Sequence, residues 1–324
     1  MKELQDFVRS NRGEILKKVK KPRIWKERDL LNERIVDAFV LILRTSGCRW
    51  AHHSGCTMCG YFKETYNAGE KEIMMQVREA AERYEGEEVV KIFTSGSFLD
   101  EKEIPVRLQR HILKTFGEAK KIIIESRPEF IDNLKFLEDD RLEVAMGLES
   151  ASNKVLEYSI NKGFTFEEWM EGAKRVKEYG MLLKAYILIK PPFMTERDAI
   201  RDAMESVEKI KNIADEISFN PVAIHGKTVV EYLWKRHLYR PPWLWSVVEV
   251  LKEARKIFDG NIRCDVVAGG KARGAHNCGR CDKNFLNAIG EFSLTQNEGV
   301  FKKLDCPCRE EWMDVLEIEQ FLKG

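Results

Sequence analysis

Three cysteines lie close together in the first fifth of the chain. Cys48, Cys56 and Cys59 are spaced Cys-x7-Cys-x2-Cys within the run TSGCRWAHHSGCTMCGYF, residues 45–62. Thiolates bind zinc or iron–sulfur clusters. Three cysteines could hold three irons of a [4Fe–4S] cluster and leave the fourth iron open. An open iron can chelate the amino and carboxylate groups of S-adenosylmethionine (SAM), and one electron from the cluster then gives a 5′-deoxyadenosyl radical.

The alternative for these cysteines is a zinc ion. A structural zinc site needs four ligands, and His52 or His53, which lie between the cysteines, could supply the fourth. The spacing alone does not separate the two metals. Position favours the cluster, because the cysteines follow the first predicted strand and polar residues close later strands. We therefore interpret the two histidines as neighbours of the site and not as ligands.

A second group of cysteines lies near the C-terminal end. It comprises Cys278, Cys281, Cys306 and Cys308. Four thiolates from two short turns predict a tetrahedral site, most simply structural zinc. The alternatives are a second iron–sulfur cluster, replacement of one cysteine by His276, or free buried thiols. Cys264 lies alone in an apolar run, so we expect it in the core.

Strands and helices that alternate along the chain must position these residues. The predicted strands are 35–45, 89–97, 120–127, 142–150, 182–190 and 216–224. The predicted helices between them include 71–85, 164–180 and 195–212. This alternation predicts a parallel α/β sheet, either a partial (β/α)6 barrel or a doubly wound sheet. In both folds the carboxyl ends of the strands carry the site.

The remaining segments divide the chain into three parts. We expect a helical and basic segment at 1–33, a barrel at 34–225, and an extension at 226–324 with two helices around RPPW, a further strand within 262–270 and the metal element. The basic run KKVKKPRIWKER, residues 17–28, is either a solvated helix and linker or a patch that contacts phosphates. For the tryptophans and tyrosines near Arg236 and Arg240 there are two interpretations. They form the apolar core of the extension, or they stack on nucleic-acid bases.

Composition limits the partners and the compartment. The 324 residues include 54 Lys and Arg against 53 Asp and Glu, so the net charge is +1 and nucleic acid would have to bind a local patch. No apolar run reaches the roughly 18 residues of a membrane span, and no signal peptide is visible. We expect a cytoplasmic chain, where eight cysteines indicate metals and not disulfides.

With these motifs, the sequence resembles the radical SAM superfamily, in its branch related to the elongator catalytic subunit. The usual first gap of three residues is expanded to seven here, and Met58 stands where an aromatic residue is usual. Within this branch the chain resembles the proteins of archaeosine biosynthesis in archaeal tRNA. The matching stretches are GCRWAHHSGCTMCGY, FTSGSFLD, ESRPEFI, GLESAS, YRPPWLWSVVEVL, CDVVAGGKARGAHNCGRCD and CPC. The resemblance implies a TIM-like radical SAM barrel with a small C-terminal metal-binding extension.

The resemblance also implies a set of cofactor-binding residues at strand ends. They are Ser95, Gly96, Ser97, Glu125, Arg127, Glu149 and Lys162. Ser95–Ser97 stand where a glycine-rich stretch meets the methionine moiety of SAM, and Glu149 stands where the family faces the ribose and methionine. Glu125 and Arg127 are either a surface salt bridge or a guanidinium group that meets a carboxylate or phosphate. Lys162 replaces a usual arginine, and Lys190 could meet substrate.

The activity that the resemblance implies is a lyase reaction on tRNA. The substrate would carry a lysine joined through its side-chain nitrogen to 7-formamidino-7-deazaguanosine. Hydrogen abstraction from the adjoining lysine carbon, followed by carbon–nitrogen cleavage, would leave archaeosine. The implied partners are tRNA, a tRNA lysine transferase and an external one-electron reductant. The alternatives are another elongator-like activity such as tRNA methylthiolation, or a zinc-bound RNA-binding scaffold without chemistry.

Overall fold

The computed structural model describes residues 2–12 and 21–321 and contains one curved sheet. Its eight strands lie in the order β1 to β8, with β2 to β8 parallel and β1 antiparallel to β2. The strands are β1 (Arg23–Leu31), β2 (Arg34–Ile42), β3 (Val89–Phe93), β4 (Lys121–Ser126), β5 (Leu142–Glu149), β6 (Leu182–Ile189), β7 (Glu216–Pro221) and β8 (Asn261–Cys264). The prediction of an α/β partial barrel is confirmed.

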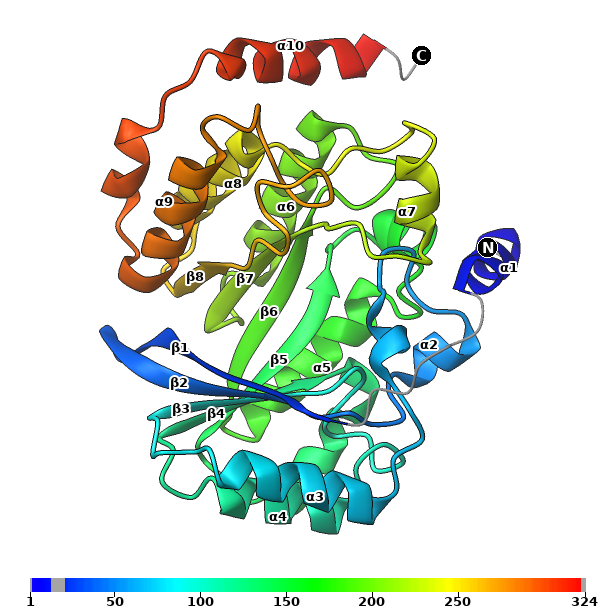
Figure 1. The fold of residues 1–324 in the computed structure, drawn as a ribbon, viewed down its shortest axis with the longest axis vertical. Helices are drawn as coiled ribbons and strands as arrows, with labels where there is room; N and C mark the ends of the chain where they lie inside the picture. The colour runs from blue at the N-terminus through cyan, green and yellow to red at the C-terminus, as the bar shows by residue number, and fades with distance from the viewer. Residues whose placement is uncertain (1, 13–20, 322–324) are drawn as a thin grey trace.

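Helices cover the outer side of this sheet (Figure 1). The helices of the described residues are α1 (Lys2–Arg12), α2 (Arg49–His53), α3 (Glu70–Ala81), α4 (Val106–Thr115), α5 (Phe166–Glu178), α6 (Glu196–Ile210), α7 (Val229–Trp234), α8 (Leu244–Ile257), α9 (Asp282–Thr295) and α10 (Cys308–Phe321). Of these, α1, α2 and α7 lie beside the strand ends, and α10 packs on α6. Shorter helical turns are η1 (Tyr61–Glu64), η2 (Pro128–Phe136), η3 (Val155–Ile160) and η4 (Glu298–Lys303). The main apolar core lies between the helices and the sheet.

The central strands are apolar because the sheet is covered on both faces. β5 reads LEVAMGLE and β6 reads LLKAYILI, as expected for parallel strands under helices. A second, smaller apolar layer lines the inner side of the barrel and includes Ala38, Val89, Ile123 and Ala145. These small side chains fit the narrow interior of a barrel.

Buried charges form one end of the barrel interior, where the parallel strands begin. We call them the ion-pair floor: Asp29, Lys91, Lys121, Glu143, Lys184, Glu216 and Arg263. Pairs on neighbouring strands lie 2.7 Å (Lys184–Glu216) and 2.9 Å (Lys121–Glu143) apart. Asp29 of β1 contacts Arg263 of β8, which is the other edge of the sheet. The floor therefore joins the two edge strands by side chains, where the sheet order shows no backbone pairing.

Replacing Asp29 by asparagine is expected to destabilise the fold by about 3–5 kcal/mol, because Arg263 and Lys91 would lose their shared buried counter-charge. Burial opposes ionisation of Asp29, but Arg263 and Lys91 outweigh it and hold its pKa well below the usual range. This stabilisation is complete above the unfolded pKa of about 4 and is lost as the pH falls below it. Urea unfolding at pH 7 and below pH 4 should show the difference between the two proteins narrowing in acid, whereas Asp37→Asn, an exposed change on β2, should have little effect.

The prediction of a helix and linker over residues 1–33 is wrong for residues 23–31, which form β1. Asn32 and Glu33 both have positive φ, at 49° and 60°, and make the tight turn that returns the chain as β2. The start of the basic run, residues 17–20, lies outside the described residues. At the other end, β8 spans residues 261–264 and so covers only residues 262–264 of the region in which a strand was expected. The sheet thus takes one strand from each of the two segments that flank the predicted barrel.

The C-terminal extension contains helices on both sides of the RPPW run. Helices α7 and α8 flank the RPPW run, and Cys264, Trp243 and Trp245 are buried in the core. Arg240 lies over the Trp243 ring at 4.0 Å from its centroid, so this arginine covers a core tryptophan. Within residues 2–12 and 21–321, no helix has the length and apolarity to cross a membrane.

Candidate metal centres and cofactor site

The first cysteine group lies in a loop that leaves the carboxyl end of β2. The backbone N–H of Cys48 donates to the Ser95 carbonyl at 3.1 Å, which joins the loop to the end of β3. The N–H of Thr57 donates to the Ile160 carbonyl at 2.9 Å, which joins it to η3. The loop is therefore held at the end of the barrel where parallel α/β folds carry their sites.

Two thiols of this loop, those of Cys56 and Cys59, are affected by burial. Burial raises the pKa of Cys56, and it raises the pKa of Cys59 to about 12. Without a metal these groups stay protonated near neutral pH, and a bound metal would displace their protons. Cys264, outside this loop, is a core residue.

The three thiols do not form a compact four-ligand site for a single ion among the described residues. Four thiolates on a zinc ion at about 2.3 Å lie about 3.8 Å apart. Cys48, Cys56 and Cys59 are not among the described side chains whose ligand atoms all lie within 4.8 Å of one another. Neither histidine completes such a set: His52 Nε2 contacts the Ser46 carbonyl at 2.8 Å, and both rings are exposed.

The segment Ser95–Ser97 lies directly against the cysteine loop. A Cβ on Gly96 would stand 2.7 Å from the Cys48 backbone nitrogen, so only glycine allows this approach. The N–H of Ser97 donates to Glu103 at 2.7 Å, and the Thr45 hydroxyl donates to the same carboxyl group. Burial raises the pKa of Glu103 to about 7. No sequence pattern had marked Glu103, which fixes both strand ends.

The predicted residues Arg127, Glu149 and Lys162 come together beside this loop. Lys162 Nζ lies 2.7 Å from Glu149 Oε1, and Arg127 donates to the Lys162 carbonyl at 3.1 Å. Burial alone would lower the pKa of Lys162, but Glu149 and then Cys56 outweigh it and raise the pKa. Both cations are more than nine-tenths buried and lie within the electrostatic field of Cys56.

Glu125 does not form the salt bridge with Arg127 that the sequence offered as one interpretation. Arg127 pairs with Glu129 at 2.6 Å and not with Glu125. The Glu125 side chain is hydrogen-bonded to Tyr186 of β6, and burial raises its pKa to about 7. The negative charge of Glu149 raises the pKa of Glu125 further, so the two carboxyl groups belong to one polar region at the barrel mouth.

This region matches the chemistry of SAM, which offers a carboxylate, an ammonium and ribose hydroxyls. Two buried cations, two carboxyl groups and the Ser95–Ser97 backbone adjoin the three thiols. Arg12 from α1 also reaches the loop, and its Nη2 atom is buried with no hydrogen-bond partner in the described structure. An orphaned donor beside three thiols fits a sulfur-rich acceptor. Sequence reasoning missed Arg12, because its neighbourhood arises only from tertiary packing.

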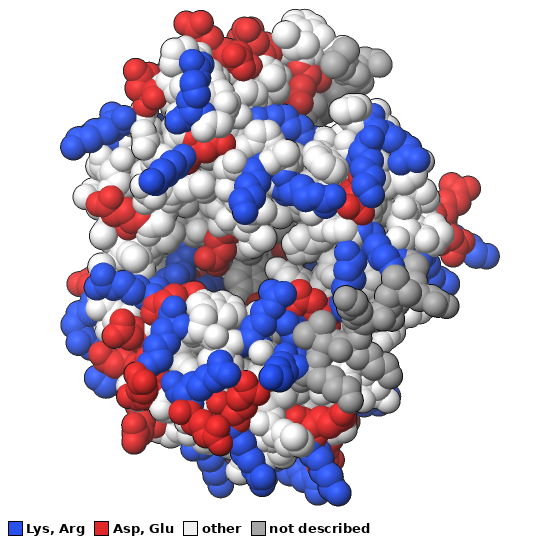
Figure 2. Space-filling view, viewed as in Figure 1, with Lys and Arg blue, Asp and Glu red and all other residues white. Residues whose placement is uncertain are grey.

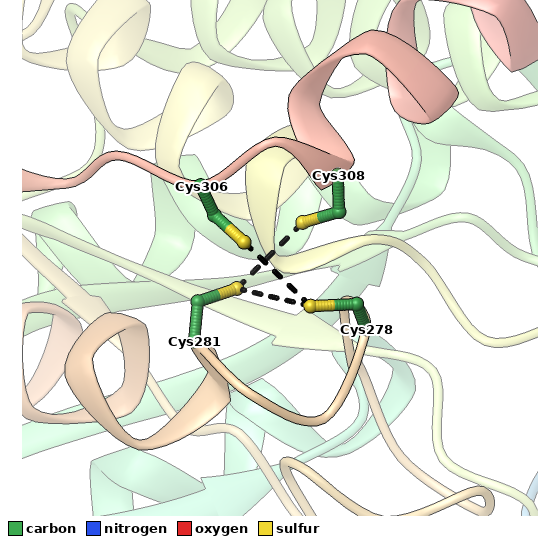
Figure 3. A group of neighbouring side chains, drawn as sticks. All are labelled: Cys278, Cys281, Cys306 and Cys308. Atoms are coloured by element: carbon green, nitrogen blue, oxygen red, sulfur yellow. Dashed lines mark hydrogen bonds between the residues drawn. The ribbon is translucent and has the colours of Figure 1, made fainter.

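The second cysteine group forms one compact site. The sulfur atoms of Cys278, Cys281, Cys306 and Cys308 all lie within 4.8 Å of one another, and Figure 3 shows the four side chains pointing inward. Neighbouring sulfur pairs are 3.6–3.9 Å apart, which is the edge of a zinc–thiolate tetrahedron. The group can therefore bind a metal. His276 is not a member, since its Nδ1 contacts the Gly274 carbonyl at 2.7 Å.

The surroundings of these sulfurs also suit a thiolate site. Cys281 precedes α9 and Cys308 begins α10, so both lie at helix amino ends, which favour negative charge. Burial raises the pKa of Cys281 and Cys308. Burial also acts to raise the pKa of Cys278, but backbone N–H groups of Arg280 and Cys281 outweigh it and lower that pKa to about 6. The Trp245 indole N–H donates to the Cys308 sulfur at 3.4 Å.

We expect one zinc per chain at this second site, and replacing Cys281 by serine should remove it. Anaerobic protein analysed by plasma mass spectrometry should lose zinc in Cys281→Ser while its iron content stays at about four atoms per chain. Cys264→Ala, which removes a core thiol outside both groups, should keep both metals. An iron content of about eight with no zinc would instead indicate a second cluster.

A basic cluster lies next to the cysteine loop. It consists of Lys63, Lys227, Lys235 and Arg273, which lie near the carboxylate of Glu231. Arg273 and Lys235 lie 2.8 Å and 3.4 Å from Glu231. Burial lowers the pKa of Lys63, and the three other cations lower it further. Figure 2 shows a hollow in the middle of one face, with Lys and Arg side chains on both sides of it.

A separate cleft of about 870 Å³ lies between the end of β6 and the C-terminal extension. Lys190, His237, Arg240 and His276 are among its lining residues. Lys190 Nζ pairs with the buried Glu196 at 2.5 Å, so its charge is already matched there. Contact of Lys190 with substrate stays a prediction.

Comparison with known proteins assigns the class of this fold and site. The family model described as the radical SAM superfamily matches residues 42–205, which include the cysteine loop and strands β3 to β6. The chain belongs to the radical SAM superfamily.

Similarity over almost the whole chain points to one kind of member. Archaeosine synthase subunit beta of Methanosarcina acetivorans is 38% identical over 93% of this chain and 91% of its own length. The protein of the same description from Thermococcus kodakarensis is 38% identical over 90% of this chain and 96% of its own. The similarity to these two relatives therefore extends over at least 90% of this chain.

Solved structures are similar in fold. Methylornithine synthase (PylB) matches with a TM-score of 0.52 at 13% identity, over 97% of this chain and 91% of its own. Queuine lyase from Clostridium spiroforme, solved with SAM and queuine, matches with a TM-score of 0.50 at 19% identity, over 67% of this chain and 90% of its own. At these identities the matches concern the fold alone.

Proposed function

We propose that this protein is a radical SAM lyase of tRNA modification. It would cleave the carbon–nitrogen bond of a lysine-modified 7-formamidino-7-deazaguanosine in tRNA and so form archaeosine. The observation that carries the proposal is the full-length similarity to archaeosine synthase subunit beta, joined to three thiols that adjoin a buried cation–carboxylate group. The cofactors would be a [4Fe–4S] cluster, SAM and a structural zinc.

Each part of the site has a task in this proposal. Cys48, Cys56 and Cys59 would hold the cluster, which together with SAM supplies a 5′-deoxyadenosyl radical when bound. Lys162 and Arg127 would bind the carboxylate of SAM through charge-assisted hydrogen bonds. Glu149 would accept from its ammonium or ribose hydroxyl groups, and the Ser95–Ser97 backbone would contact the methionine moiety. The charge and proximity of Lys162, Arg127 and Glu149 support these roles.

The reaction itself would remove one hydrogen atom from the lysine carbon that bears the formamidine nitrogen. That hydrogen ends on 5′-deoxyadenosine, and the lysine-carbon radical would give up one electron, which replaces the electron that reduced the cluster, to leave an iminium ion. Water would add to this carbon and the carbon–nitrogen bond would break, which leaves an aldehyde on the lysine fragment and the nitrogen, with its hydrogen, on the base. A polar, bulky substituent of this kind requires an open barrel mouth. The cysteine loop lies at the carboxyl ends of the parallel strands, where a barrel has its mouth. An external donor must supply the initial electron.

The partners follow from charge and from the relatives' description. Lys63, Lys235 and Arg273 of the basic cluster lie near one another beside the cysteine loop, and such local positive charge supports contact with the phosphates of tRNA. The relatives are described as a subunit, which supports a second protein in the reaction. We propose that this second protein is the tRNA lysine transferase that installs the substituent.

Mass spectrometry of digested tRNA tests the proposal. Lysine-modified tRNA is incubated anaerobically with the protein, SAM and dithionite, and nucleosides are measured over time. We expect archaeosine to appear with equimolar loss of the lysine-modified nucleoside. A sulfur-containing nucleoside would indicate methylthiolation instead, and unchanged tRNA with intact SAM would indicate a binding scaffold. Unmodified tRNA serves as the control and should give no archaeosine.

A further inference from the structure

Helix α1 packs beside the cysteine loop. Val8 is 2% exposed and belongs to the same apolar cluster as Ile160. Cys56 and Met58 of the cysteine loop pack against this cluster. Phe7 meets the Tyr232 ring of α7 edge-on, with ring centroids 4.9 Å apart. Figure 1 shows α1 on the side of the molecule where α2 and α7 lie. The helix thereby carries its last residue, Arg12, to the loop.

Arg12 is enclosed by the backbone of that loop. Its side chain is buried, and the residue is 8% exposed. Nη1 donates to the Ala51 carbonyl, and the guanidinium carbon lies 4.6 Å from the centre of the Phe62 ring. A Cβ on Gly55 would overlap Nη2, and Gly55 has φ +90°, so glycine leaves the room that the guanidinium occupies.

One edge of this guanidinium has no partner. Nη2 is buried without a hydrogen bond to any described residue, and no ion pair of Arg12 with a described carboxylate is present. The other two cations of the site differ, since Arg127 pairs with Glu129 and Lys162 with Glu149. A buried, charged donor that lacks an acceptor costs free energy.

The unpartnered Nη2 lies directly against Gly55, the residue that precedes Cys56 in the cysteine loop. Burial lowers the pKa of Arg12, and Cys59, Cys56 and Cys48 all act in the opposite direction. All three cysteines therefore lie within the electrostatic reach of the guanidinium. Hydrogen bonds and charges next to an iron–sulfur cluster set its reduction potential.

We propose that Arg12 is a positioning residue that donates a hydrogen bond from Nη2 to the iron–sulfur cluster or one of its thiolates and raises the cluster's reduction potential. The inference rests on the cluster of the proposed function. One-electron reduction by dithionite adds a negative charge to the cluster, and a buried cation stabilises the reduced form more than the oxidised form. Loss of Arg12 should therefore make the cluster harder to reduce.

A redox titration followed by electron paramagnetic resonance tests this effect. At the wild-type midpoint, Arg12→Gln should show a ratio of reduced to oxidised cluster at least about tenfold lower, equivalent to about 59 mV for one electron. Arg12→Lys keeps the charge and should recover most of the shift. Arg9→Gln, an exposed change on the same helix, should match the wild type. A wild-type midpoint in iron-replete Arg12→Gln overturns the inference.

A second measurement detects the contact between the arginine and the cluster directly. Wild-type protein with ¹⁵N-labelled guanidinium groups is reduced, and the nuclear coupling to the cluster is recorded. We expect a ¹⁵N coupling from one arginine, which should be absent from Arg12→Lys. A cluster-bearing protein without that coupling overturns the inference and leaves the proposed function intact. A wild-type protein that holds no iron cluster at all would instead overturn the proposed function.

Discussion

Replacing Cys59 by alanine is expected to abolish both the iron cluster and the cleavage of SAM. Cys59 is one of only three thiols in the loop, and the adjacent histidines are exposed and directed to other partners. With two thiolates left, the cluster would lack half of the four protein ligands that such clusters usually have. Anaerobically reconstituted variant should show iron near zero at the first site and 5′-deoxyadenosine at the background of the protein-free reaction.

The matched control for this experiment is Cys264→Ala. It removes one thiol from the same chain, but from a core position outside both cysteine groups. We expect wild-type iron, zinc and SAM cleavage in that variant, with a modest loss of stability from the cavity. Wild-type cluster content and activity in Cys59→Ala would contradict the assignment of the loop.

The second large effect concerns Lys162. Changing it to methionine is expected to weaken SAM binding by about 10- to 100-fold, since a charge-assisted hydrogen bond contributes about 1.5–3 kcal/mol. The lysine is buried beside Cys56 and pairs with Glu149, so its removal also leaves that carboxylate without its cation. Equilibrium dialysis with labelled SAM under anaerobic conditions measures the affinity directly.

Lys154→Met is the control for Lys162→Met. Lys154 is exposed and lies just before η3, eight residues from Lys162. The control therefore makes the same lysine-to-methionine change at a position outside the site. It should bind SAM like the wild type. Equal affinity in the two variants would show that Lys162 does not contact SAM, and iron analysis of each variant separates a loss of SAM binding from a loss of the cluster.

Much of the barrel could be predicted because its strands are apolar and its helices amphipathic. The runs that became β2 to β7 are β-branched and bounded by polar turns, so their period and length were visible. The strand ends were visible too, since Glu149 and Arg127 follow apolar segments where an unpaired charge is costly. Gathering them at one end of the barrel requires only that the strands be parallel.

The first strand could not be predicted, because charges take the inward positions that apolar residues usually occupy. Glu27 and Asp29 of β1 pair with Lys91 across the barrel, so the segment RIWKERDLL lacks the expected alternation. Only the ion-pair floor as a whole satisfies these charges. Arg12 and Glu103 were invisible for a related reason, because their partners lie 39 and 58 residues away along the chain.

The central claim is that three thiolates leave one iron of the cluster open to SAM. The most direct measurement is nuclear coupling in the dithionite-reduced protein with SAM labelled with ¹⁷O in its carboxylate and ¹⁵N in its amino group. The account predicts couplings from both labels to the reduced cluster. A paramagnetic cluster with neither coupling, or a colourless protein with zinc in the first cysteine loop, would contradict it.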